Sequence, residues 1–133
     1  MQWDKVKKYH LTPPTEFGEF TRANPIQLEY DLFKESLVRK NISILESIQT
    51  KYFDGNLESY VIVPNAFPYS LESNLEHLIL WVKPGCEFDL NSVETCICEF
   101  MTHNYFSDWI YFKNELGLQS VLSILHWHII GKR

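Results

Sequence analysis

The spacing of the apolar residues changes near residue 57, and this change is the strongest constraint on the fold. Between Tyr30 and Tyr52, apolar side chains recur mostly at steps of three and four residues, which predicts one long helix with a single apolar stripe. After residue 57, short β-branched and aromatic runs bounded by prolines and glycines are typical of strands. Helices followed by strands, with one helix inserted among them, predict an α+β domain with a mainly antiparallel sheet.

Four segments after residue 57 have the composition of strands, and one predicted helix separates the second from the third. The strands are expected at residues 59–63, 77–82, 109–112 and 123–130. The second is apolar on both faces, which favours a central position in the sheet. Asn91 or Ser92 is expected to cap the helix. The apolar stripe of this helix consists of Val93, Cys96, Ile97, Phe100 and Met101. The first ten residues form an amphipathic lead-in that can be a frayed arm.

Length and charge limit the class of protein. The 133 residues are enough for one domain and too few for two, with residues 1–57 as its helical part and 58–133 as its sheet part. A net charge of −5 argues against general nucleic-acid binding, which needs an excess of Lys and Arg on one face. No apolar run reaches the roughly 18–20 residues that span a bilayer, and no signal-peptide layout is present. Three cysteines without framework spacing indicate a reducing compartment, so the expected location is cytoplasmic or nuclear.

The predicted last strand carries the residues best suited to chemistry. His126 and His128 are two apart, so on a strand they share one face, while Leu125, Trp127 and Ile129 point into the core. Histidine is the ordinary side chain that can act as nucleophile, acid–base group or metal ligand near neutral pH. One imidazole of such a pair can attack phosphorus or hold a leaving-group proton, while the other binds a phosphoryl oxygen.

The surroundings of the histidine pair leave three interpretations open. A polar loop from Asn114 to Ser120 precedes the strand and can add an amide, a hydroxyl and backbone N–H groups to a bound anion. His77 begins another predicted strand, so a metal site of three histidines is an alternative. The third interpretation is that the histidines have a purely structural role. His10 and His103 are expected in solvent, and Trp81, Trp109 and Phe112 are expected in the core.

Five stretches of the chain follow a known order of motifs. They are Val63–Tyr69, Glu76–Trp81, Trp109–Asn114, Leu118–Val121 and His126–Ile129. These stretches resemble the fungal N-acetylglucosamine-induced protein family, a widespread domain of unknown function. The pattern of that family runs Asn-x-x-Pro-Tyr, His-Leu-hydrophobic-Trp, Trp-Phe-x-Asn, Leu-x-Ser-hydrophobic and a closing His-x-His-hydrophobic. The agreement extends from about Glu58 to Ile130.

The C-terminal stretch is also similar to the histidine-triad (HIT) nucleotide hydrolases and transferases. Their motif is His-φ-His-φ-His-φ-φ, where φ is hydrophobic, and their middle histidine attacks the α-phosphate. The resemblance implies that His126 is the nucleophile, that His128 is the third histidine, and that Asn114 and Ser120 bind phosphate. The chain departs from this motif because Ile124 occupies the first triad position, and because Ser120 lies one residue further from His126 than in the usual arrangement.

The leading hypothesis is a HIT-like phosphohydrolase or nucleotidyl transferase that needs no cofactor and acts on a nucleotide or a phosphorylated small molecule. The candidate catalytic residues are His126 and His128, and the candidate substrate-binding residues are Asn114, Gln119, Ser120 and His77. Loss of the first triad histidine motivates the alternative, a non-catalytic ligand-binding or regulatory protein on the same fold. The third hypothesis is a metal-dependent hydrolase that uses His77, His126 and His128. Because HIT-like domains commonly pair, the resemblance also implies a homodimer.

Overall fold

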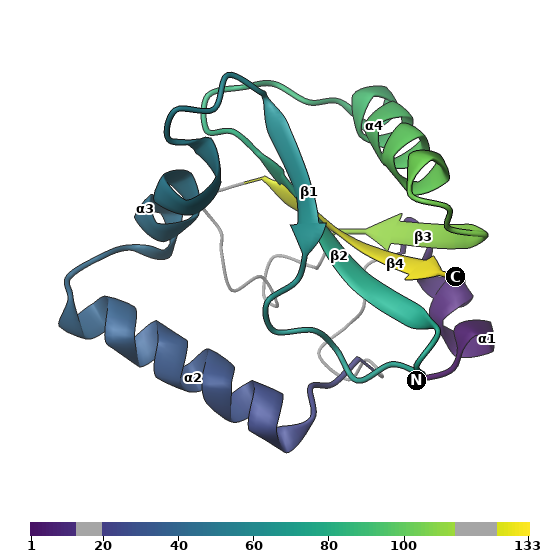
Figure 1. The fold of residues 1–133 in the computed structure, drawn as a ribbon, viewed down its shortest axis with the longest axis horizontal. Coiled ribbons are helices and arrows are strands. Elements are labelled where there is room, and N and C mark those ends of the chain that lie inside the picture. Colours follow the sequence, from purple (N-terminus) through teal and green to yellow (C-terminus); the bar gives the residue numbers. More distant parts are fainter. Residues whose placement is uncertain (13–19, 114–124) are drawn as a thin grey trace.

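A computed structural model describes residues 1–12, 20–113 and 125–133, and these residues form an α+β fold around one antiparallel sheet (Figure 1). The order of its four strands is β1-β2-β4-β3. The strands are β1 (Tyr60–Pro64), β2 (Leu75–Val82), β3 (Asp108–Phe112) and β4 (His126–Lys132). All three neighbouring pairs are antiparallel, as the sequence predicted, and the apolar β2 lies inside the sheet beside β4. The predicted start of the last strand at residues 123–124 lies outside the described residues.

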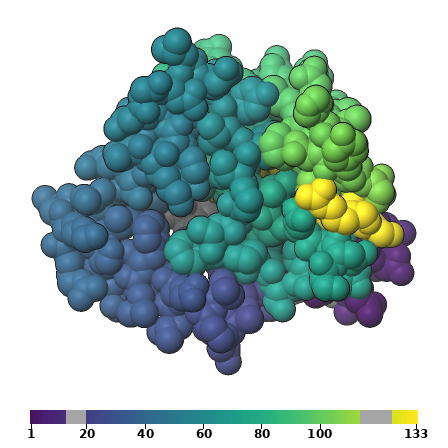
Figure 2. Space-filling view, viewed as in Figure 1, coloured from purple at the N-terminus to yellow at the C-terminus, as the bar shows by residue number. Residues whose placement is uncertain are grey.

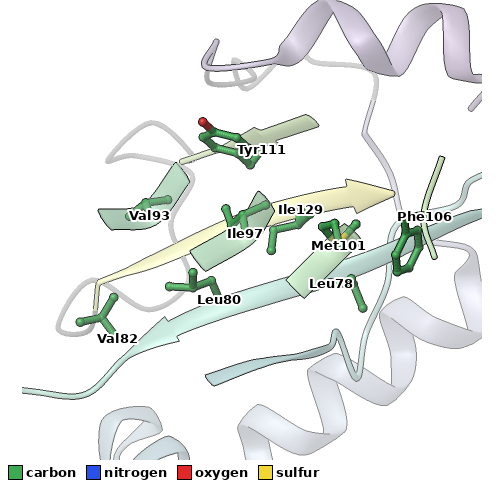
Figure 3. Packing of buried hydrophobic residues seen from close by; sticks show 9 residues of the cluster. All are labelled: Leu78, Leu80, Val82, Val93, Ile97, Met101, Phe106, Tyr111 and Ile129. Carbon is green, nitrogen blue, oxygen red and sulfur yellow. The ribbon is translucent and has the colours of Figure 1, made fainter. Parts of the chain in front are cut away.

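Helix α4 (Leu90–His103) covers one face of the sheet, and the main apolar core lies beneath it. Figure 3 shows Val93, Ile97 and Met101 of α4 packed against Leu80 of β2 and Ile129 of β4. The predicted apolar stripe of this helix is therefore confirmed. Its predicted cap, Asn91 or Ser92, is wrong by two or three residues, because the cap is Asp89, whose carboxylate accepts a 2.8 Å hydrogen bond from the backbone N–H of Ser92.

The other face of the sheet is covered by the N-terminal half of the chain. Its elements are α1 (Trp3–Val6), the 3₁₀ turn η1 (Lys7–Tyr9), α2 (Asn24–Arg39), α3 (Ile44–Ile48) and the π-helical turn η2 (Gln49–Phe53). Trp3 and Val6 are buried in one cluster with Ile110, Phe112 and Ile130. The first residues therefore pack on the sheet, and the prediction of a frayed arm is wrong. Among the described residues, no helix is both long enough and apolar enough to cross a membrane.

The long helix predicted between Tyr30 and Tyr52 is broken into α2 and α3. Asn41 adopts a positive φ of 55° directly after α2, and the N–H of Ile42 donates to the carbonyl of Leu37 at 2.9 Å. This arrangement is the Schellman ending of a helix. Ser43 then caps α3, since its hydroxyl oxygen accepts a 3.0 Å hydrogen bond from the N–H of Glu46. Figure 1 shows that the break lets α2 and α3 run in different directions on the same side of the sheet.

Gly131 of β4 lies directly under the far end of α4. A Cβ atom at this position would come within 2.5 Å of Met101 Cε and 2.6 Å of Phe106 Cδ1. We therefore expect Gly131→Ala to lower the free energy of unfolding by about 1–3 kcal/mol, the usual cost of overpacking a core. Urea denaturation measures this change, and Gly131→Ala combined with Met101→Ala should recover part of it. An unchanged unfolding midpoint in the single variant would contradict the close packing.

Candidate functional site

The floor of the candidate site is the sheet face opposite to α4. Alternation along β4 places His126 and His128 on this face, while Trp127 and Ile129 pack toward the α4 side. His128 is paired across the sheet with Ile79 of β2, and His126 is paired with Trp81. Both imidazoles are buried, and their ring centroids are 5.7 Å apart. The predicted sharing of one face by the two histidines is therefore confirmed.

A hydrogen-bonded pair of imidazoles joins β2 to β4. Nε2 of His77 lies 2.8 Å from Nδ1 of His128, and both rings are buried. Nδ1 of His77 accepts a 3.0 Å hydrogen bond from the backbone N–H of Tyr69. The Tyr69 ring stacks on His77 with a centroid separation of 4.4 Å, and Phe112 stacks on the far ring, His128, at 5.4 Å. The two histidines are thus fixed by direct contacts on several sides.

The segment after β1 brings Tyr69 back to His77. The N–H of Asn65 donates to the carbonyl of His77 at 2.9 Å, and its Oδ1 accepts a 2.8 Å hydrogen bond from the N–H of Phe67. This second bond forms a local turn of the kind that Asn side chains favour. The Asn-x-x-Pro-Tyr motif therefore has a structural role, because its first residue shapes the turn and its last residue contacts the imidazole.

A cavity of about 310 Å³ lies above this floor, at the lower end of the size range of small-molecule sites. Figure 2 shows the surface hollowed where α2, α3 and the segment after β1 meet. The walls are mainly aromatic and aliphatic. The described lining residues are Arg22, Tyr30, Phe33, Ile44, Ser47, Ile48, Lys51, Tyr52, Pro64, Asn65, Ala66, Phe67, Tyr69, Ile79, Trp81, His126 and His128.

The charged side chains among these lining residues are cations. Arg22 lies over the ring of Tyr30 at 4.4 Å and over that of Tyr69 at 5.4 Å, and its Nε–H donates to the carbonyl of Phe67 at 2.8 Å. Lys51 lines the other part of the cavity beside Tyr52. Neither cation forms an ion pair with a described carboxylate, and no described lining residue is Asp or Glu. The described part of the cavity wall therefore favours an anion.

The buried imidazole pair is held in its neutral form. Burial, together with a smaller contribution from the nearby Arg22 guanidinium, lowers the pKa of His77 from 6.5 to about 3. Burial also holds the pKa of His128 well below 6.5, with smaller contributions from His77, His126 and Arg22. At neutral pH each ring therefore has one nitrogen that donates and one that accepts.

The structure brings together the three histidines that the sequence selected, His77, His126 and His128. The predicted substrate-binding residues Asn114, Gln119 and Ser120 lie outside the described residues, as does Ile124. His10 and His103 are exposed as predicted, although the ring of His10 also contacts Tyr111. In the part of the chain that the structure describes, no group of three or more His, Cys, Asp or Glu side chains is arranged to hold a metal ion.

Several lining residues were not selected from the sequence. Trp81 was expected only in the core, but it also lines the cavity and contacts the ring of His126 at 4.9 Å. Asn65 and Tyr69 belonged to a recognised motif that carried no assigned role. Arg22 and Lys51 lie in helical or connecting segments without any local signal, so only the path of the chain shows that they line the cavity.

The fold and the cavity define an antiparallel α+β domain with a pocket built around buried histidines. The sequence matches the family described as "Protein of unknown function (DUF3605)" over residues 2–132, and the chain belongs to this family. It is 30% identical, over 152 aligned positions, to N-acetylglucosamine-induced protein 1 of Candida albicans. That alignment covers 94% of this chain and 58% of the relative, so the chain spans little more than half the length of that protein. The resemblance to the N-acetylglucosamine-induced family is therefore confirmed.

A solved structure described as "Crystal Structure of HTC1" has the same fold. The TM-score is 0.64 at 21% sequence identity, and the superposition covers 99% of this chain and 85% of that chain. This match supports the α+β architecture. The likeness to the HIT superfamily remains a prediction.

Proposed function

We propose that the protein binds a nucleotide or another phosphorylated small molecule in the histidine-floored cavity. The observation that carries this proposal is the position of Arg22, which lies beside the buried His77–His128 pair in a cavity without a described carboxylate. Guanidinium groups are well suited to phosphate oxygens, because they donate two parallel hydrogen bonds and keep their charge. Arg22 is expected to bind the phosphoryl group.

The remainder of the cavity fits the less polar part of such a ligand. Phe33, Tyr52 and Trp81 present aromatic surface to the cavity, and Ile44 and Ile48 add aliphatic surface. Aromatic side chains bind planar rings by stacking, at a gain of about 1–3 kcal/mol for a nucleobase. A phosphate bound to Arg22 would occupy the charged part of the cavity, and a planar ring stacked on these aromatic side chains would occupy the apolar part.

Arg22→Gln is expected to weaken binding of a phosphorylated ligand by about 10-fold to 100-fold, because it removes a charged donor from the phosphate. A thermal-shift screen of the metal-free protein against mono-, di- and cyclic nucleotides and sugar phosphates identifies the ligand. Isothermal titration with the best compound then measures the loss of affinity.

Arg39→Gln is the matched control, because Arg39 lies exposed on α2 and does not line the cavity. The unfolding temperature of each ligand-free variant separates a loss of binding from a loss of structure. If no phosphorylated compound stabilises the wild-type protein at millimolar concentration, the proposed function is wrong.

A second candidate function is phosphoryl or nucleotidyl transfer by His126. Its support is the shared face of His126 and His128 within a cavity that also holds Arg22. An imidazole nitrogen of His126 would form a bond to phosphorus while the bond from phosphorus to the leaving-group oxygen breaks. Water would then cleave the phosphorus–nitrogen bond and restore the imidazole. In this candidate, Asn114, Gln119 and Ser120 keep their predicted role of binding phosphate oxygens.

This candidate is tested by trapping the covalent intermediate. A ligand found by the thermal-shift screen is mixed with excess enzyme, quenched in alkali and analysed by peptide mass spectrometry. Catalysis by His126 requires an adduct on the His126 peptide that is absent from His126→Ala and present in the exposed-site control His103→Ala. Binding without turnover or adduct would leave the protein as a non-catalytic binding module.

A further inference from the structure

We infer that His77 is a positioning residue that holds His128 as a hydrogen-bond donor to the cavity, so that the site recognises a ligand oxygen and not a metal cation. The ligand group is an acceptor such as a phosphoryl or carbonyl oxygen. This inference rests on the proposed function for the identity of the ligand, but it also makes a statement about the two imidazoles that holds without any ligand.

The first step is the tautomer of His77. The backbone N–H of Tyr69 can only donate, and it lies 3.0 Å from Nδ1 of His77. Nδ1 must therefore be the acceptor nitrogen of this ring. A neutral imidazole carries its single N–H proton on the other nitrogen, so Nε2 of His77 is a donor.

The second step follows from the contact between the two rings. Nε2–H of His77 lies 2.8 Å from Nδ1 of His128, a short distance for a nitrogen–nitrogen hydrogen bond. Nδ1 of His128 must accept this bond. The proton of neutral His128 therefore lies on Nε2. The backbone N–H of Tyr69 thus fixes the tautomer of His77, and His77 fixes the tautomer of His128, which lines the cavity.

The third step concerns the neighbour that also approaches Nε2 of His77. Nδ2 of Asn65 lies 3.4 Å from this nitrogen, and the orientation of the amide is fixed because Oδ1 accepts from the N–H of Phe67. Nδ2 is a donor, so it cannot accept the His77 proton. Nε2–H of His77 therefore donates to Nδ1 of His128, the nearer of the two nitrogens and the one that can accept.

The surroundings of the pair favour this neutral arrangement. Among the described residues, Arg22 from the segment before α2 and His126 from β4 lower the pKa of His128, and the neutral phenol of Tyr69 stacks on both rings. Arg22 and His126 disfavour a further positive charge, and no described carboxylate lines the cavity to stabilise an imidazolium. Burial of the two rings acts in the same direction.

The chemical consequence is selectivity for an acceptor. A metal ion needs the lone pair of an imidazole nitrogen, but Nδ1 of His77 accepts from Tyr69 and Nδ1 of His128 accepts from His77. The other nitrogen of His128, Nε2, carries a proton, so it donates to an oxygen and offers no lone pair to a metal ion. Arg22 and His128 both lie against the ring of Tyr69, at 5.4 Å and 5.6 Å, and Arg22 supplies the charge for an anion, so the two groups fit one phosphoryl group.

The tautomers are tested on the full chain by long-range proton–nitrogen correlation NMR of ¹⁵N-histidine-labelled protein. We expect His77 and His128 to be neutral Nε2–H tautomers at neutral pH. In His77→Ala, His128 should lose its single tautomer, and His77→Gln should restore it because an amide can accept from Tyr69 and donate to His128. The exposed His103 serves as internal reference. A proton on Nδ1 of His128 in the wild-type protein would overturn the inference, and this result does not depend on whether any variant folds.

The ligand part is tested with inorganic phosphate, the best nucleotide from the screen, and Zn²⁺. We expect phosphate to shift the Nε2–H resonance of His128, and His77→Ala to weaken phosphate binding by about tenfold while His77→Gln recovers it. Equal affinity in wild type and His77→Ala would refute the positioning role. Stoichiometric Zn²⁺ binding at His77 and His128 would refute the selectivity. Correct tautomers without binding of any phosphate compound would instead refute the proposed function and its ligand class.

Discussion

Replacing Leu80 with alanine is expected to lower the free energy of unfolding by about 2–5 kcal/mol. Leu80 lies in the second half of β2, is fully buried, and is paired with Ile62 on one side and Trp127 on the other. The strands on both sides and α4 above restrict how far neighbouring groups can move into the space, so a cavity remains (Figure 3). Urea denaturation should show a lower midpoint with an unchanged dependence on denaturant.

Leu57→Ala is the matched control for this substitution. It removes the same atoms from a side chain that is 98% exposed, so the unfolding free energy should change by no more than about 0.5 kcal/mol. If the two variants were equally stable, Leu80 would not occupy the core between the sheet and α4.

Acidification from neutral pH to about pH 5 is expected to destabilise the protein by about 2 kcal/mol through His77, and His128 adds to this loss in the same direction. The pKa of His77 is about 3 in the folded protein, that of His128 is also well below 6.5, and both rise to about 6.5 on unfolding. Between these values the unfolded chain binds more protons than the folded one. The stabilisation is therefore complete above pH 6.5 and is lost progressively as the pH falls toward 3.

Urea denaturation at several pH values between about 7 and 5 measures this loss, in a range where most carboxylates remain ionised. His77→Gln has one buried imidazole fewer and should show a smaller pH dependence than the wild type, and His103→Gln is the control at an exposed position. A stability that stays constant over this range would mean that the two rings are not held neutral by burial.

The strands and α4 could be predicted because their signals are local. Each strand is a short β-branched or aromatic run with a turn residue at its end, and the stripe from Val93 to Met101 is continuous. The break after α2 also had local signals, Asn41 and the Ser43-x-x-Glu46 capping pattern, but they were outweighed by apolar residues that happen to keep a helical spacing across the break. Burial of Trp3 and Val6 had no local signal, because it depends on contacts with strands that lie about 70 to 127 residues further along the sequence.

The floor of the site could be predicted from alternation alone, since His126 and His128 needed only a strand to share a face. His77 could be proposed but not placed, because its contact with His128 depends on how β2 and β4 are aligned. Arg22 could not be predicted. It reaches the cavity because the segment before α2 contacts the segment after β1, where its Nε–H donates to Phe67.

Gly131 has a consequence for the site that goes beyond packing. In an antiparallel sheet, sliding one strand by a single residue turns every side chain to the opposite face. Such a slip of β4 would direct Trp127 and Ile129 into the cavity, bury the imidazoles under α4, and place Ile130 or Lys132 where Met101 and Phe106 leave no room for a Cβ. A residue without a side chain thus helps to fix the alignment of β4, and with it the presence of histidines in the pocket.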